Sequence, residues 1–222
     1  MSDYLDDLVE VHGQLSHAIS VGAEVRGRYA GRVPALVGEL WEKLGVGSWG
    51  DGQFWLAEPT PYAQILNAAF HNDLELSSAD CYVIGYSAFG SLTFWSERHW
   101  LGLLDLTCGH VTCTGLVHPH EKKDAELSLF APLYGLESLA PEQFDDDDEP
   151  LFEQAVESLG PLQPGECYGF FPALAMGGPP RLGHLRRTNA LAHFAFLAQL
   201  THFTLVDYLA LPPREIRVVG TP

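Results

Sequence analysis

The stretch that decides the fold is residues 45–56, GVGSWGDGQFWL. Its first six residues, Gly45 to Gly50, fit the pattern G-x-G-x-x-G, which binds dinucleotides where it follows a strand and opens a helix. Here the order is reversed, because residues 34–44 have apolar residues at helical spacing and residues 53–56 are short, aromatic and strand-like. No helix N-terminus remains for a phosphate group. The glycines are therefore interpreted as a tight connection between a helix and a strand.

The patterns on either side of this stretch predict the fold class. Helical spacing predicts helices over residues 2–12 (capped by Ser2), 34–44, 61–70, 124–137, 151–159 and 188–201. Strands are expected over residues 53–57, 81–86, 91–95, 101–108 and 111–116, the last four as two hairpins. Helices followed by an antiparallel meander indicate an α+β fold, with helices packed on a mainly antiparallel sheet and a helical C-terminal part.

Composition limits the classes of partner. The chain has 222 residues with 12 basic and 29 acidic side chains, which give a formal net charge of −17. Such a charge repels nucleic acid, which requires a basic surface. It attracts a basic protein and speeds their encounter. An acidic surface also simply keeps a protein soluble, so charge alone leaves both interpretations open.

The ends and the cysteines indicate a cytoplasmic protein. The N-terminus is acidic and resembles no signal peptide, and no run of about 18 apolar residues predicts a membrane span. The four cysteines are spread out in a chain large enough to fold without disulfides, which favours reduced thiols: Cys81, Cys108, Cys113 and Cys167.

Two further patterns suggest chemistry, and both fit poorly. Gly85-Tyr-Ser87-Ala-Phe89 approaches the nucleophile elbow G-x-S-x-G, but Phe89 replaces the last glycine and no helix follows. Five possible zinc ligands lie within thirteen residues, in none of the familiar spacings: Cys108, His110, Cys113, His118 and His120. We expect no catalytic residues, no metal and no cofactor, and hence a protein that is not an enzyme.

The acidic run Asp145, Asp146, Asp147, Asp148 and Glu149 is the candidate partner-binding site. A block of like charge is usually a solvated loop, and this one could instead place negative charge at the N-terminus of the helix expected over 151–159. The functional interpretation is a contact surface for a basic partner.

Several ordered motifs resemble a known domain pair. The stretch from Tyr29 to Leu56, with its Trp-x-x-x-Gly helix end, Gly-Asp-Gly loop and aromatic strand, resembles the GAD-like domain, and residues 87–95 look like the hairpin that follows. Residues 151–202 resemble the C-terminal domain of immunity proteins that accompany DNase effectors of bacterial type VI secretion. The expected domains are thus residues 1–137, GAD-like, and residues 138–222, immunity-type, packed into one compact unit.

The resemblance implies an activity without catalysis. Such a protein binds a cognate secreted toxin, here expected to be a basic nuclease, and neutralises it in the cytoplasm of the producing cell. The alternative is a non-catalytic regulatory or interaction module with no toxin partner. The sequence leaves the contact residues, the oligomeric state and the identity of the toxin open.

Overall fold

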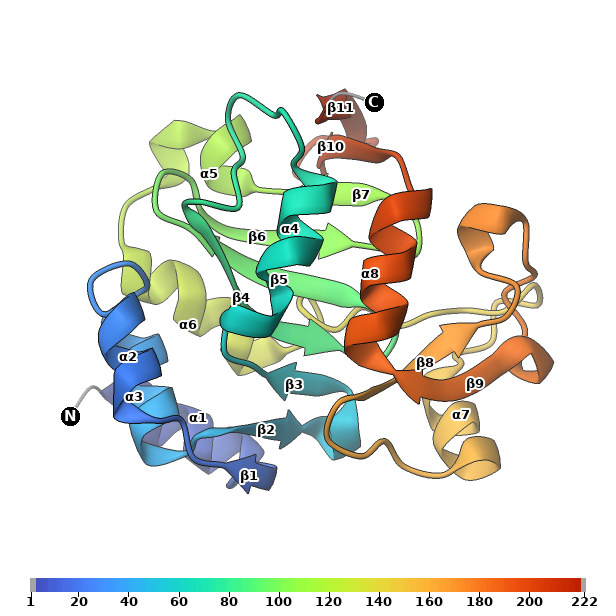
Figure 1. The fold of residues 1–222 in the computed structure, drawn as a ribbon, viewed down its shortest axis with the longest axis horizontal. Helices are drawn as coiled ribbons and strands as arrows, with labels where there is room; N and C mark the ends of the chain where they lie inside the picture. The colour runs from blue at the N-terminus through green and yellow to red at the C-terminus, as the bar shows by residue number, and fades with distance from the viewer. Residues whose placement is uncertain (1–2, 221–222) are drawn as a thin grey trace.

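The computed structural model describes residues 3–220, and in this range a nine-stranded sheet forms the centre of the molecule (Figure 1). Its strands, in spatial order, are β1 (Ser16–Ile19), β2 (Val46–Trp49), β3 (Phe54–Leu56), β4 (Cys81–Ser87), β5 (Ser91–Ser96), β6 (Trp100–Asp105), β7 (His110–Thr112), β10 (Phe203–Asp207) and β11 (Arg214–Val219). A separate hairpin consists of β8 (Glu166–Phe170) and β9 (Leu185–Asn189).

The helices are α1 (Asp3–His12), α2 (Ala23–Tyr29), α3 (Ala35–Lys43), α4 (Ala63–Ala69), α5 (Thr114–Val117), α6 (Ala125–Gly135), α7 (Phe152–Leu159) and α8 (Ala190–Leu200). Neighbouring strands of the large sheet are antiparallel except β7 and β10, which are parallel. This arrangement confirms the predicted α+β class, with α7 and α8 in the C-terminal part. None of the helices within residues 3–220 is long and apolar enough to cross a membrane.

The quoted stretch forms more structure than a loop. Gly45, at φ +84°, ends the turn after α3, but residues 46–49 then form β2 and reverse at Gly50–Gly52 into β3. The interpretation as a plain connection was therefore incomplete. The cause is a close approach of β1, since a Cβ on Gly47 would lie 2.6 Å from the Ser16 carbonyl oxygen. Residues 46–49 form a strand by pairing with β1 and β3, and only glycine fits at position 47 beside β1.

Two apolar cores lie on opposite faces of the sheet. Helices α4 and α8 cover one face (Figure 1), where Phe94, Leu104, Val111 and Phe194 are buried. Helices α1, α2, α3 and α6 cover the other face, around Trp41. The strand residues of this second core come from β2 to β6. Among the described residues, the strands β7 and β10 contribute no side chain to this second core.

Several elements differ from the sequence prediction. The second hairpin is shorter than expected, because the chain leaves β7 after Thr112 and residues 114–117 form α5 instead of a strand. The prediction also lacked helix α2 and strands β1, β2, β8, β9, β10 and β11. The N-cap expected at Ser2 lies outside the described residues.

Candidate functional site

The acidic run forms a closed loop with defined geometry. The backbone N–H of Asp145 donates to the carbonyl of Glu149 at 3.0 Å, and at the base Leu151 N–H donates to the Gln143 carbonyl at 2.8 Å. Inside the loop, Oδ1 of Asp145 accepts the N–H groups of Asp147 and Glu149 at 2.9 and 3.0 Å. Asp145 therefore shapes the loop, and the remaining acids extend from it.

The acids at the tip of the loop are exposed, and one of them has a basic partner. Nε of Arg181 donates to Oδ2 of Asp146 at 2.5 Å, which ties the loop to the segment after β8. Asp147, Asp148 and Glu149 are exposed and form no ion pair with any described residue. These three carboxylates are free to meet a partner.

The capping role considered for the run belongs to another residue. Oε1 of Glu142 accepts hydrogen bonds from the N–H groups of Leu151 at 3.2 Å and Phe152 at 3.0 Å, at the N-terminus of α7. A carboxylate at this position satisfies unpaired N–H groups and complements the helix dipole. The acids 145–149 are thus not needed to begin the helix.

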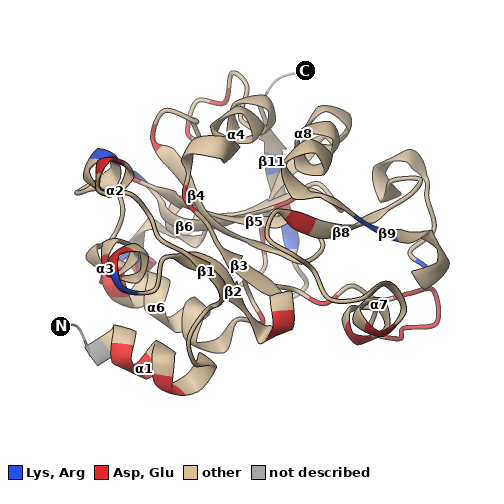
Figure 2. Cartoon of the chain, turned by 60° about the horizontal axis from the view of Figure 1, so that its bottom comes forward, with Lys and Arg blue, Asp and Glu red and all other residues tan. Residues whose placement is uncertain are grey.

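Negative charge extends beyond the loop. Figure 2 shows acidic residues along α1, α3 and α7 and in the loop beside α7, whereas basic residues are few and scattered. The loop is the densest group, with five acids in a row.

Ser87 has a structural position. It is 1% exposed at the end of β4, and its Oγ accepts the N–H of Ser91 at 3.0 Å across the hairpin turn. The residue therefore stabilises the turn between β4 and β5, and no elbow forms around it.

The five possible zinc ligands are spread over separate elements. Cys108 is exposed in the turn before β7, while Cys113 is buried at the end of that strand, where burial raises the pKa of its thiol to about 12. Nε2 of His120 lies 3.3 Å from Oε1 of its neighbour Glu121. Across residues 3–220, no group of three or more His, Cys, Asp or Glu side chains has the geometry to hold a metal ion.

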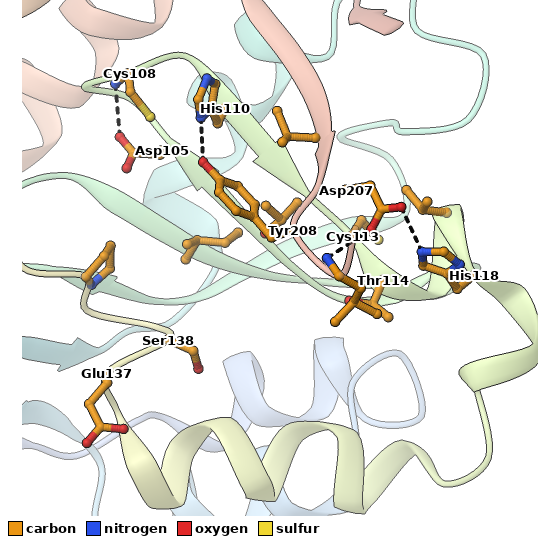
Figure 3. Close-up of a pocket in the computed structure, with 16 residues that line it drawn as sticks. Asp105, Cys108, His110, Cys113, Thr114, His118, Glu137, Ser138, Asp207 and Tyr208 are labelled. Carbon is orange, nitrogen blue, oxygen red and sulfur yellow. Dashed lines mark hydrogen bonds and ion pairs between the residues drawn. The ribbon is translucent and has the colours of Figure 1, made fainter. Parts of the chain in front are cut away.

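Four of these five residues line a pocket of about 410 Å³ (Figure 3): Cys108, His110, Cys113 and His118. His118 Nε2 lies 3.0 Å from Oδ2 of Asp207, and His110 Nδ1 lies 2.7 Å from the hydroxyl of Tyr208. Both partners come from the end of β10 and the loop after it. Figure 3 shows Tyr208 between His110 and Thr114, with Glu137 and Ser138 on the opposite rim.

Asp207 and Tyr208 were not predicted as site residues, because no helix or strand was expected after residue 201. The alternation of Phe203, Leu205 and polar Thr204 was the available signal for a strand. Its pairing with β7 joins residues 94 positions apart in the register Thr204 with His110, which no local pattern reveals.

Two family models match separate parts of the chain. Residues 3–104 match the family model of the GAD-like domain. Residues 134–201 match the model described as T6SS immunity protein Tdi1, C-terminal, where T6SS is the type VI secretion system. The chain thus matches the models of both domains, as the resemblance predicted, and this pair of matches supports a T6SS immunity role.

A solved structure shares the whole fold. The crystal structure of Atu4351 from Agrobacterium tumefaciens superimposes with a TM-score of 0.92 and covers 98% of each chain at 25% sequence identity. No curated protein matches the chain.

Proposed function

We propose that this protein is a non-enzymatic immunity protein that binds a secreted nuclease toxin in the cytoplasm of the producing cell and blocks its basic cleft. The observation that carries the proposal is the acidic loop, in which Asp147, Asp148 and Glu149 are exposed, unpaired and held on a hydrogen-bonded turn. The T6SS immunity domain that includes this loop supports it.

The physical reason is charge complementarity. A nuclease binds phosphates, so its working cleft carries lysine and arginine. Carboxylates on a preformed loop can meet these cations with little loss of conformational freedom. The net charge of −17 speeds the encounter over a longer range.

The test measures association with the product of the adjacent reading frame, which is the candidate toxin. In one variant, Asp147→Asn, Asp148→Asn and Glu149→Gln remove three loop charges. Asparagine suits the positive φ of +62° at Asp148. A matched variant removes the same charges from α1, by Asp6→Asn, Asp7→Asn and Glu10→Gln. We expect the loop variant to lower the association rate about tenfold at low salt and the α1 variant to lower it far less.

Growth of cells that express the toxin gives the functional readout. Wild-type protein and the α1 variant should restore growth, and the loop variant should restore it only at higher expression. If both variants lowered the association rate equally, the effect would come from net charge, and the loop would not be part of the interface. Absence of any complex with the toxin would favour the alternative, an interaction module without a toxin partner.

A further inference from the structure

The pocket of Figure 3 lies beside the strands β6, β7 and β10 and the short helix α5. Leu103 on β6, Thr112 on β7 and Val206 on β10 form its floor, and α5 and residues 137–141 form its sides. Its volume of about 410 Å³ is within the range of sites that bind small organic molecules.

The pocket carries more negative than positive charge. Asp105, Glu137 and Asp207 line it, and none of its lining residues is a lysine or arginine. Asp207 is paired with His118 and, at 3.7 Å, with Arg214. Asp105 and Glu137 form no ion pair with any residue between positions 3 and 220. Asp105 accepts hydrogen bonds from Ser91, Thr107 and Cys108. Glu137 is exposed on the rim, so two carboxylates without a basic partner border the apolar space.

The rest of the lining is apolar, with one aromatic ring. Val117, Val206 and Leu209 contribute aliphatic surface. The ring of Tyr208 is 52% exposed and is fixed by the 2.7 Å contact between its hydroxyl and His110. An exposed and fixed aromatic ring attracts cations to its face.

We propose that this pocket binds an organic cation with an apolar body, of the amidine or guanidine class. The apolar body lies against Val206 and Val117, and the positive group lies near Tyr208, Asp105 and Glu137. The site is separate from the acidic loop, and the proposal is independent of the proposed function. The same chemistry is offered by a free small molecule and by an arginine side chain of a protein partner.

The test uses benzamidine as the probe, with benzoate and benzyl alcohol as anionic and neutral ligands of similar size. Ligand-observed NMR and calorimetry at pH 7.5 should show saturable binding of benzamidine, about tenfold tighter than that of benzoate. Glu137→Lys should weaken benzamidine about fivefold, whereas Glu157→Lys, the same change on exposed α7, should leave the affinity nearly unchanged. Ser138→Trp, on the exposed rim, should fill the pocket and abolish binding.

Failure of benzamidine to bind, equal binding of benzoate, or equal effects of the two lysine variants would each overturn the proposal. Binding lost when the toxin is added would assign the pocket to a basic side chain of that partner. Binding kept in the complex would assign it to a free ligand. Because the immunity function is tested on the acidic loop, a negative result here leaves that proposal standing.

Discussion

The guanidinium of Arg217 and the carboxylate of Asp73 form a two-point ion pair, with Nη1 2.5 Å from Oδ2 and Nη2 3.0 Å from Oδ1. Arg217 lies on the edge strand β11, and Asp73 lies in the loop after α4. The Asp73 side chain is 3% exposed and also accepts the N–H groups of Leu76 and Gly220. This contact fixes the last strand to the first half of the chain.

Replacing Arg217 should destabilise the protein strongly. In Arg217→Met the apolar stem remains, but Asp73 stays buried without its basic partner, which should lower the free energy of unfolding by about 3 kcal/mol. Urea denaturation measures the change. The control is Arg186→Met, since the exposed Arg186 side chain bonds, within residues 3–220, only to the carbonyls of Gly183 and Leu185. Equal losses in the two variants would show that the ion pair does not stabilise the fold.

The same pair predicts a pH dependence. Burial alone would raise the pKa of Asp73, but hydrogen bonds from Arg217 and from the N–H groups of Gly220, Leu76 and Glu75 outweigh it and lower the pKa. The unfolded value is about 3.9, so the stabilisation is complete above about pH 5 and is lost as the pH falls toward the lower folded value. Urea unfolding between pH 3 and 6 should show a decline on acidification that is smaller in Asp73→Asn. An identical decline in both proteins would contradict this.

Glu126 on α6 should stabilise the neighbouring helix α3. Its two carboxylate oxygens accept the N–H groups of Ala35 at 2.7 Å and Leu36 at 3.0 Å, at the N-terminus of α3. Glu126→Ala should lower the free energy of unfolding by about 1–2 kcal/mol, because two N–H groups and the helix dipole lose their acceptor. Chemical denaturation measures this, with the exposed Glu153→Ala on α7 as control. An unchanged denaturation midpoint would mean that water replaces the carboxylate without cost.

The glycines of the quoted stretch should differ in their tolerance of alanine. Gly45 and Gly50 both have positive φ, at +84° and +58°. A Cβ on Gly45 would overlap the carbonyl of Ile19 on β1, whereas one on Gly50 would lie 3.4 Å from the flexible side chain of Gln53. Gly50→Ala should therefore lower the free energy of unfolding by about 1 kcal/mol, and Gly45→Ala should lower it clearly more. Thermal melting measures both changes. Equal melting temperatures would show that β1 moves freely away from the turn.

Sequence patterns predicted the elements whose signals are local. The hairpin of β4 and β5 and the helices α3 and α8 follow from alternation and helical spacing, and all are confirmed. The pattern failed at β2, where Gly47 is a strand residue only because β1 approaches its backbone. That approach is a tertiary contact, and propensity carries no information about it.

The same distinction between local sequence signals and tertiary contacts applies to the two candidate sites. The acidic run is visible in the sequence. The sequence does not show that Asp145 shapes the loop, or that Glu142, and not the run, accepts the first N–H groups of α7. The pocket could not be predicted, because His118 meets Asp207 across 89 positions of sequence. Cys108, His110, Cys113 and His118 were considered as zinc ligands because of their residue types, and in the structure they line this pocket. The domain boundary near residue 137 stays a prediction.

The parallel pairing of β7 with β10 has a consequence for synthesis on the ribosome. Residues 203–207 supply the strand that covers the edge of β7, so a nascent chain that ends before them exposes an unpaired strand edge. The edge of β7 is therefore covered only after residues 203–207 have been synthesised and have paired with it.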